Sequence, residues 1–281
     1  MSTPPRSSVR ASSAREQRTT VRSLAACKRQ GRRFTMLTAY DHPFARIFDE
    51  AGIDVLLVGD SLGNVVQGGD TTLPVTLDDV LYHTRWVSRA ARRALVVADM
   101  PFGSYQVSPE EALRSAVRRV KEGGAHAVKL EGGVRVAETI RRIVDAEIPV
   151  MGHVGLTPQA VHRMGGYRVQ GRTEAERARV LADARAVEQA GAFSVVLEGM
   201  PEDLARELTA TLSIPTIGIG AGPHCDGQVL VMHDMLGLND EHVPAFVKQY
   251  VNLGALASQA ARAFAEEVAN GKFPAEEHCY R

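Results

Sequence analysis

Eight short apolar segments, separated by longer amphipathic ones, constrain the fold of this 281-residue chain more than any other feature. The short segments are rich in Val, Ile and Leu and do not alternate with polar residues, which is typical of strands covered on both faces of a parallel sheet. Eight such strands with helical crossovers predict an α/β fold of the (β/α)8 TIM barrel type in a single domain, and a doubly wound open sheet is the alternative. The predicted strands are Phe34–Ala39, Asp54–Val58, Ala94–Ala98, Ala127–Leu130, Pro149–His153, Ser194–Leu197, Thr216–Gly218 and Val229–Met232.

The segments between the predicted strands carry the start and stop signals of helices. Ser108 precedes Pro109 and two glutamates, an arrangement that begins a helix, and the pair Gly123-Gly124 ends it. Gly191 is a suitable C-cap for the segment before it. The predicted helices are Pro43–Ala51, Pro109–Gly123, Thr173–Ala190, Pro201–Leu212 and Pro244–Asn270.

Charge and cysteine content narrow the possible functions. The chain has 33 Lys and Arg against 33 Asp and Glu, and this balance argues against a nucleic-acid partner, which favours a basic excess. No apolar segment approaches the roughly 18 residues of a membrane span, so no membrane partner is expected. Cys27, Cys225 and Cys279 are too far apart for a disulfide framework or a CxxC motif, and they predict a reducing, cytoplasmic location.

Residues 1–20 differ in composition from the rest of the chain. They are rich in Ser and Arg, with Glu16 as their only acid. Transit peptides have this kind of composition, but without an amphipathic stripe it favours a disordered N-terminal tail. Residues 21–281 are then predicted to form the barrel domain, with an irregular end over Asn270–Arg281.

Polar residues gather at the ends of the predicted strands. Because the carboxyl ends of barrel strands meet at one rim, we expect these side chains to converge there. Buried carboxylates need a cation, a proton or hydrogen-bond donors, so several acids at one rim predict a hard divalent metal such as Mg2+. Zinc is less favoured because only one histidine accompanies the acids. The residues are Asp60, Ser61, Asp99, Lys129, Glu131, His153 and Glu198.

A metal with open positions can chelate a 2-oxo acid through its carboxylate and keto oxygens and stabilise the enolate. Lys129 could then bind the substrate carboxylate as a point charge, and a remaining carboxylate could remove the proton next to the carbonyl. The glycines at 218, 220 and 222 do not have the spacing of a dinucleotide fingerprint. They favour close backbone packing or a tight loop, with a phosphate-binding loop as the alternative.

Nine ordered motifs carry a resemblance to a known family. They are Met36–Asp41, Val58–Asn64, Asp99–Tyr105, Val128–Gly133, His153–Gln159, Gly165–Arg172, Leu197-Glu198, Ile217–Gly222 and Asp226–Asp234. The chain resembles the ketopantoate hydroxymethyltransferase (3-methyl-2-oxobutanoate hydroxymethyltransferase) family from about residue 20 to its C-terminus. The resemblance implies a (β/α)8 barrel enzyme of pantothenate biosynthesis that assembles as a homo-oligomer, commonly a decamer.

The resemblance also implies the reaction and the residue roles. The small-molecule substrates would be 2-oxoisovalerate and the co-substrate 5,10-methylenetetrahydrofolate, the cofactor Mg2+, and the products ketopantoate and tetrahydrofolate. Glu198 would be the catalytic proton acceptor, and His153 a further substrate contact. The implied metal residues are Asp60, Asp99 and Glu131, and the implied substrate-binding residues are Asp60, Ser61, Asp99 and Lys129.

Two other functions are compatible with an acidic barrel rim. One is a Mg2+-dependent lyase or mutase of the phosphoenolpyruvate mutase/isocitrate lyase type, which also acts on 2-oxo acids or their enolates. The Lys-Lys-Cys-Gly-His stretch of isocitrate lyases does not occur in this sequence. The other is a catalytically silent metal- or ligand-binding barrel, which the complete set of rim residues disfavours.

Overall fold

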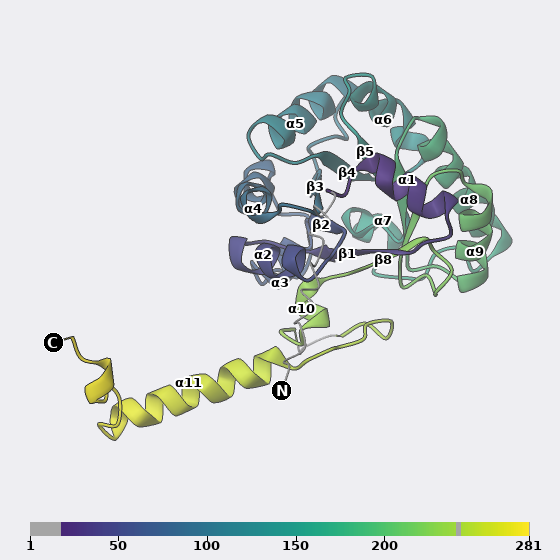
Figure 1. Ribbon diagram of the computed structural model, residues 1–281. Coiled ribbons are helices and arrows are strands. Elements are labelled where there is room, and N and C mark those ends of the chain that lie inside the picture. The colour runs from purple at the N-terminus through teal and green to yellow at the C-terminus, as the bar shows by residue number, and fades with distance from the viewer. Residues whose placement is uncertain (1–17, 240–242, 281) are drawn as a thin grey trace, which may run out of the picture.

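The computed structural model describes residues 18–239 and 243–280. Eight parallel strands form a closed barrel that is surrounded by helices (Figure 1). Each strand pairs with its neighbours in the chain, and the last strand closes the barrel on the first. The predicted TIM barrel is therefore confirmed, and the doubly wound open sheet is wrong. The strands are β1 (Phe34–Thr38), β2 (Val55–Val58), β3 (Leu95–Asp99), β4 (Ala127–Glu131), β5 (Val150–Gly155), β6 (Ser194–Glu198), β7 (Thr216–Ile219) and β8 (Gly227–Leu230).

Four of the five predicted helices are present to within two residues at each end: α2 (His42–Glu50), α5 (Pro109–Lys121), α8 (Glu174–Gln189) and α9 (Glu202–Thr211). The fifth prediction is wrong in its first part. The C-terminal helix α11 spans Leu253–Ala269 and begins there because the Asn252 side chain accepts a hydrogen bond from the Ala255 amide at 2.9 Å.

The structure also contains helices that the sequence analysis does not predict. One of them, α4, begins with a capping box between Thr76 and Asp79, which was the available sequence signal. The barrel helices in this group are α1 (Val21–Arg29), α4 (Leu77–Ala90) and α6 (Ala137–Val144). The shorter elements are α3 (Leu62–Val65), α7 (Val161–Met164), α10 (Met232–Met235), and the 3-10 turns η1 (Val134–Val136), η2 (Pro158–Ala160) and η3 (Glu276–His278). The last of these lies in the C-terminal segment that was expected to be irregular.

Side chains on alternate positions of the strands fill the barrel interior, among them Met36, Met151 and Val196. Helix α1 closes the N-terminal end of the barrel with Leu24, which is 1% exposed. Thr20 caps this helix. The predicted disordered tail falls mainly on residues 1–17, which lie outside the described part of the chain. Because α1 closes the N-terminal end, the barrel interior can be reached from the carboxyl-terminal end, where the polar side chains lie.

The outer face of β8 is less covered than that of the other strands. Gln228 on this face is exposed and Leu230 is half-buried, and the neighbouring Thr35 of β1 is exposed as well. Helix α11, which follows β8 and α10, does not pack there but extends away from the barrel (Figure 1), and none of its residues is buried. Neither α11 nor another helix in the described residues is long and apolar enough to cross a membrane.

Candidate active site

All seven rim residues predicted from the sequence line one small cavity of about 100 Å3 at the carboxyl end of the barrel. Strand register explains the convergence, since Asp99 pairs with Lys129 across β3 and β4, and Glu131 with His153 across β4 and β5. Lys129 and Glu131 stand two residues apart on one strand, so both side chains face inward. The residues are Asp60, Ser61, Asp99, Lys129, Glu131, His153 and Glu198. The rest of the lining comes from Thr38, Pro158 and the apolar side chains of Leu57, Val196, Ile219, Val229 and Val231.

A buried ion pair occupies the centre of the site. Lys129 Nζ donates a hydrogen bond to Asp99 Oδ1, and both side chains are at most 5% exposed. Burial favours the neutral form of Lys129, but the carboxylates of Asp99, Asp60 and Glu131 together raise its pKa above the usual value. Lys129 is therefore a permanently charged group in the cavity.

Two carboxyl groups of the site have a pKa well above the usual value. Burial, with the charge of Asp99 as the next cause, raises the pKa of Asp60 to about 7. Burial also raises the pKa of Glu131 well above its usual value, and the charge of Asp60 adds to this. Both groups would release their protons more readily if a cation were bound beside them.

The Asp60 and Asp99 side chains are brought together by the backbone between β2 and α3. The Asp60 amide donates to Asp99 Oδ2 at 3.1 Å. A Cβ on Gly59 would lie 3.0 Å from Ser61 Oγ and 3.5 Å from Asp99 Oδ2, so a larger residue would crowd this approach. Ser61 Oγ in turn shares a hydrogen bond of 2.7 Å with the hydroxyl of Tyr40, whose pKa is raised mainly by burial.

Gln159 and Tyr105 connect the two sides of the site, and sequence reasoning assigned neither of them a role. Gln159 Nε2 donates to Asp60 Oδ2 at 2.8 Å, and the backbone amide of Gln159 donates to Glu131 Oε2 at 3.0 Å. The Tyr105 hydroxyl donates to Gln159 Oε1 at 2.7 Å. Both residues lie within motifs of the family resemblance, which was the available signal, but their pairing depends on the folded loops.

A third residue without a predicted role, Arg119 of α5, contacts the end of β3 from outside the barrel. It is completely buried, and its Nε donates to the backbone oxygen of Asp99. Burial lowers the pKa of Arg119 to about 9, and its two terminal nitrogens have no partner among the described side chains and backbone. The guanidinium therefore contributes positive charge beneath the acidic rim.

Glu198 lies at the edge of the cavity and is its most accessible acid, with a side chain 16% exposed. Its Oε2 lies 3.1 Å from His153 Nε2, and His153 Nδ1 lies 3.5 Å from Glu131 Oε1, but neither contact has the angles of a hydrogen bond. The imidazole thus stands between the two glutamates. Glu198 is placed to exchange a proton with a molecule in the cavity.

The oxygen atoms at this rim fit a magnesium ion. Asp60 and Asp99 supply two adjacent carboxylates, and Glu131 Oε1 is a buried oxygen without a hydrogen-bond partner among the described residues. No group of three or more His, Cys, Asp or Glu in residues 18–239 and 243–280 forms a ready-made metal cage. Mg2+ does not require one, because it usually takes one or two carboxylates and keeps water or substrate in its other positions.

This arrangement predicts a pH-dependent response to Mg2+. A carboxyl group whose pKa is raised on folding stabilises the folded state as the pH falls through that pKa. Without metal, we expect Asp60 to add about 1.4 kcal/mol to the free energy of unfolding between about pH 8 and about pH 6. Because Mg2+ competes with this proton, it should raise Tm more at about pH 8 than at about pH 6.

Thermal unfolding with Mg2+ and with a chelator measures this difference, and Asp60→Asn is the matched variant. An equal Mg2+ effect at both pH values in the unmutated protein would contradict the assignment of Asp60 to the metal.

The fold and the site together define an α/β barrel enzyme with an acidic carboxyl-terminal rim. Similar solved structures include a phosphonopyruvate hydrolase in complex with oxalate and Mg2+, with a TM-score of 0.60 and 13% identity over 93% of this chain and 91% of that chain. Another is a 2,3-dimethylmalate lyase of the PEP mutase/isocitrate lyase superfamily, with a TM-score of 0.57 and 18% identity over 93% and 92% of the two chains. Identities this low show the fold alone.

Sequence comparison is more specific. A model of the ketopantoate hydroxymethyltransferase family matches residues 18–276. A 3-methyl-2-oxobutanoate hydroxymethyltransferase of Geobacter sulfurreducens is 59% identical over 261 residues, which cover 93% of this chain and 98% of the relative. Its namesake from Pelobacter propionicus is 56% identical over 264 residues, with 94% and 98% covered. The chain belongs to the ketopantoate hydroxymethyltransferase family, as the resemblance predicted, and the lyase or mutase alternative is less supported.

Proposed function

We propose that this protein transfers a hydroxymethyl group from 5,10-methylenetetrahydrofolate to 2-oxoisovalerate, with Mg2+ as cofactor, for pantothenate biosynthesis. The observation that carries the proposal is the meeting of Asp60, Asp99, Lys129 and Glu198 in one cavity with apolar walls. Carboxylates and an ammonium group suit the charged end of a 2-oxo acid, and Val196, Ile219 and Val229 suit its isopropyl end. The family relationship supplies the reaction class.

In this proposal, Asp60 and Asp99 would be the residues that hold Mg2+, and Glu131 would be the third acid of the metal site. Bound Mg2+ supplies a Lewis acid that stabilises negative charge on the keto oxygen of the substrate. The similarly folded phosphonopyruvate hydrolase was solved with oxalate and Mg2+, which supports this choice of ion. Lys129 and Ser61 orient the 2-oxo acid, and Lys129 adds positive charge near its carboxylate.

Glu198 removes the proton from C3 of 2-oxoisovalerate, and the electron pair of that C–H bond enters the enolate. C3 then forms a bond to the one-carbon unit of the folate, and the two bonds from that carbon to folate nitrogens break. One water supplies the hydroxyl oxygen, and its other proton and the proton taken from C3 are passed to those nitrogens as tetrahydrofolate leaves. In this proposal His153, whose Nε2 lies 3.1 Å from Glu198 Oε2, is a further contact of the substrate. The apolar wall limits access of bulk water to the enolate.

The decisive experiment follows the C3 proton of 2-oxoisovalerate by NMR in D2O, without folate. We expect exchange with Mg2+ and its loss with a chelator. If well-folded, metal-loaded protein shows no exchange and also makes no ketopantoate when 5,10-methylenetetrahydrofolate is added, the proposed function is wrong. Turnover of phosphonopyruvate or 2-methylisocitrate in place of this reaction would establish the lyase or mutase alternative.

We further propose that the protein is a homo-oligomer in which α11 packs against another copy. This helix exposes Leu256, Phe264 and Val268, and an isolated helix with exposed apolar side chains gains stability when a partner covers them. The less covered outer face of β8 offers a place for such a helix. The decamer implied by the family resemblance stays a prediction.

Phe264→Asp should therefore reduce the molecular mass measured by light scattering, because it places a charge in the proposed interface. Arg262→Gln, a polar change on the same exposed helix, should leave the mass unaltered. If Phe264→Asp and the unmutated protein have the same mass, α11 is not the interface. We also propose a cytoplasmic location, which the three free cysteines support.

A further inference from the structure

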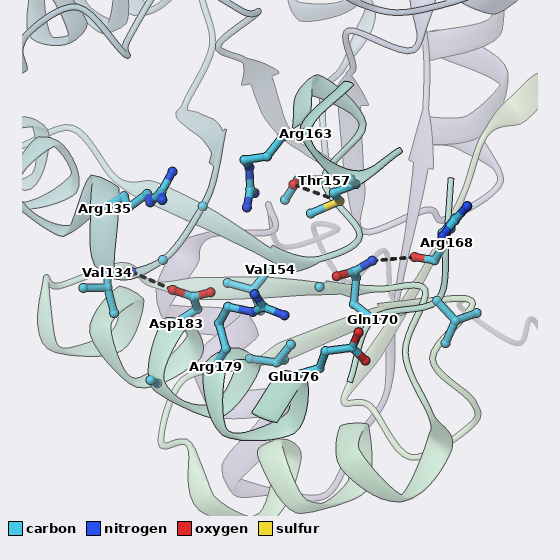
Figure 2. Close-up of a pocket in the computed structure, with 17 residues that line it drawn as sticks. Val134, Arg135, Val154, Thr157, Arg163, Arg168, Gln170, Glu176, Arg179 and Asp183 are labelled. Atoms are coloured by element: carbon cyan, nitrogen blue, oxygen red, sulfur yellow. Dashed lines mark hydrogen bonds between the residues drawn. The ribbon is translucent and has the colours of Figure 1, made fainter. Parts of the chain in front are cut away.

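A second and larger cavity, of about 560 Å3, opens beside the rim between the segment that follows β4, the end of β5 and α8. Four arginines line it, Arg135, Arg163, Arg168 and Arg179, against only two acids, Glu176 and Asp183. Figure 2 shows Arg163 reaching into it from α7, in the segment after β5, and Arg179 from α8 on the opposite side. Its volume falls in the range of about 300–1,000 Å3 that is typical of ligand pockets.

The carboxylates of both acids in this cavity accept hydrogen bonds from backbone amides. Asp183 Oδ1 accepts a hydrogen bond from the Val134 amide at 2.9 Å. Glu176 Oε2 accepts from the amides of Arg172 and Thr173 at 3.0 and 3.2 Å. None of the four arginines forms an ion pair within 4 Å with a described residue, so their guanidinium groups can receive an anion.

The arginine-lined cavity adjoins the candidate active site. Its residues Gly132 and Gly133 directly follow Glu131, and Val154 and Gly155 directly follow His153. The segment after β5 also forms backbone hydrogen bonds with the end of β6. The Leu156 amide donates to the oxygen of Glu198 at 2.8 Å, and the Gln170 amide donates to that of Gly199 at 2.8 Å.

The negative charges of the rim affect the pKa of Tyr167, which lies between Arg163 and Arg168 in this segment. Burial raises the pKa of Tyr167, and the negative charges of Asp60, Glu198 and Glu131 raise it further. Pro158 of the same segment lines the smaller cavity, and Arg163 and Arg168 line the larger one, so this segment borders both cavities. A ligand held by the arginines would extend toward the mouth of the active site.

We infer that the arginine-lined cavity binds the glutamate tail of the folate co-substrate, with the pterin end directed toward Glu198. This inference rests on the proposed function. Each glutamate of a γ-linked tail carries a free carboxylate, and planar guanidinium groups bind carboxylates with two parallel hydrogen bonds. The 2-oxo acid cavity, at about 100 Å3, is much smaller than the neighbouring one and is suited to the smaller substrate.

The test compares tetrahydrofolate with one and with three glutamates, by calorimetric binding and by KM of the corresponding 5,10-methylene forms. In the unmutated protein, the triglutamate adds two carboxylates and should bind about 5- to 25-fold more tightly, since each added exposed ion pair corresponds to up to about fivefold. The double variant Arg163→Gln/Arg179→Gln should lose this preference and raise the KM for the triglutamate by about the same factor. The control, Arg185→Gln, changes an exposed arginine of α8 outside the cavity and should keep the preference.

Equal affinity for the two folates in the unmutated protein would overturn the inference, whatever the variants do. A full preference in the double variant would overturn it as well. Proton exchange at C3 without folate reports separately on the 2-oxo acid site. If exchange and ketopantoate formation occur but the number of glutamates has no effect, the proposed function stands and only the assignment of this cavity fails.

Discussion

Glu198→Gln is expected to fold and to bind 2-oxoisovalerate and Mg2+, but to lose about 100- to 10,000-fold in turnover. Glutamine has nearly the shape of glutamate but cannot accept the C3 proton. Glu198 is the acid with the most exposed side chain in the cavity, and its Oε2 lies 3.1 Å from His153 Nε2, so the change removes the base while leaving the buried network of Asp60 and Asp99 in place. The measurements are ketopantoate formation and proton exchange at C3.

Glu174→Gln is the matched control for Glu198→Gln, because Glu174 is an exposed acid in the first turn of α8 and lines neither cavity. It should retain full activity. Unchanged turnover in Glu198→Gln would remove Glu198 from the role of base. Retained proton exchange with lost ketopantoate formation would move Glu198 from deprotonation to a later step of the reaction.

Lys129→Met is the second change with a large expected effect. It leaves Asp99 and Asp60 buried without the ammonium group that faces them. Breaking a buried ion pair by removing one partner costs about 3–5 kcal/mol, so we expect the free energy of unfolding to fall by this amount in the presence of a chelator. Turnover should fall as well, because the cavity loses the charge that faces the substrate carboxylate.

Mg2+ distinguishes the two consequences of Lys129→Met. A cation at Asp60 and Asp99 would compensate part of the lost positive charge, so Mg2+ should raise the Tm of the variant more than that of the unmutated protein. Lys121→Met, on the exposed last turn of α5, is the control and should change the free energy of unfolding by less than about 0.5 kcal/mol. Equal stability of Lys129→Met and the unmutated protein would contradict the structural role of the ion pair.

The sequence predicts the barrel because each strand that is buried on both faces appears in it as a short continuous run of apolar residues. Val55–Val58, for example, is apolar at every position and completely buried, so its pattern does not depend on distant residues. The eighth strand is less well defined, and β8 begins two residues before the predicted segment. Gly227 and Gln228 carry no strand signal, and they join the sheet because Gly227 pairs with Phe34 across the closing edge.

The positions of the seven rim residues could also be predicted from the sequence, because they follow from the ends of the predicted strands. Carboxyl ends of parallel strands always meet at one rim, so a polar residue at a strand end can be placed there before any contact is known. The role of Gln159 could not be predicted in this way. Its amide group reaches Asp60 across 99 positions of the chain, and only the folded loops bring the two together at 2.8 Å.

The sequence alone determined the class of fold, the family and the seven rim residues, since each depends on local pattern or on motifs along the chain. Tertiary structure decided three other features: the buried contacts that raise the pKa of Asp60, the direction of α11 away from the barrel, and the gathering of four arginines beside the rim. These depend on distances between segments remote in the chain. Burial and through-space charge act over such distances, and neither leaves a periodic signal in the sequence.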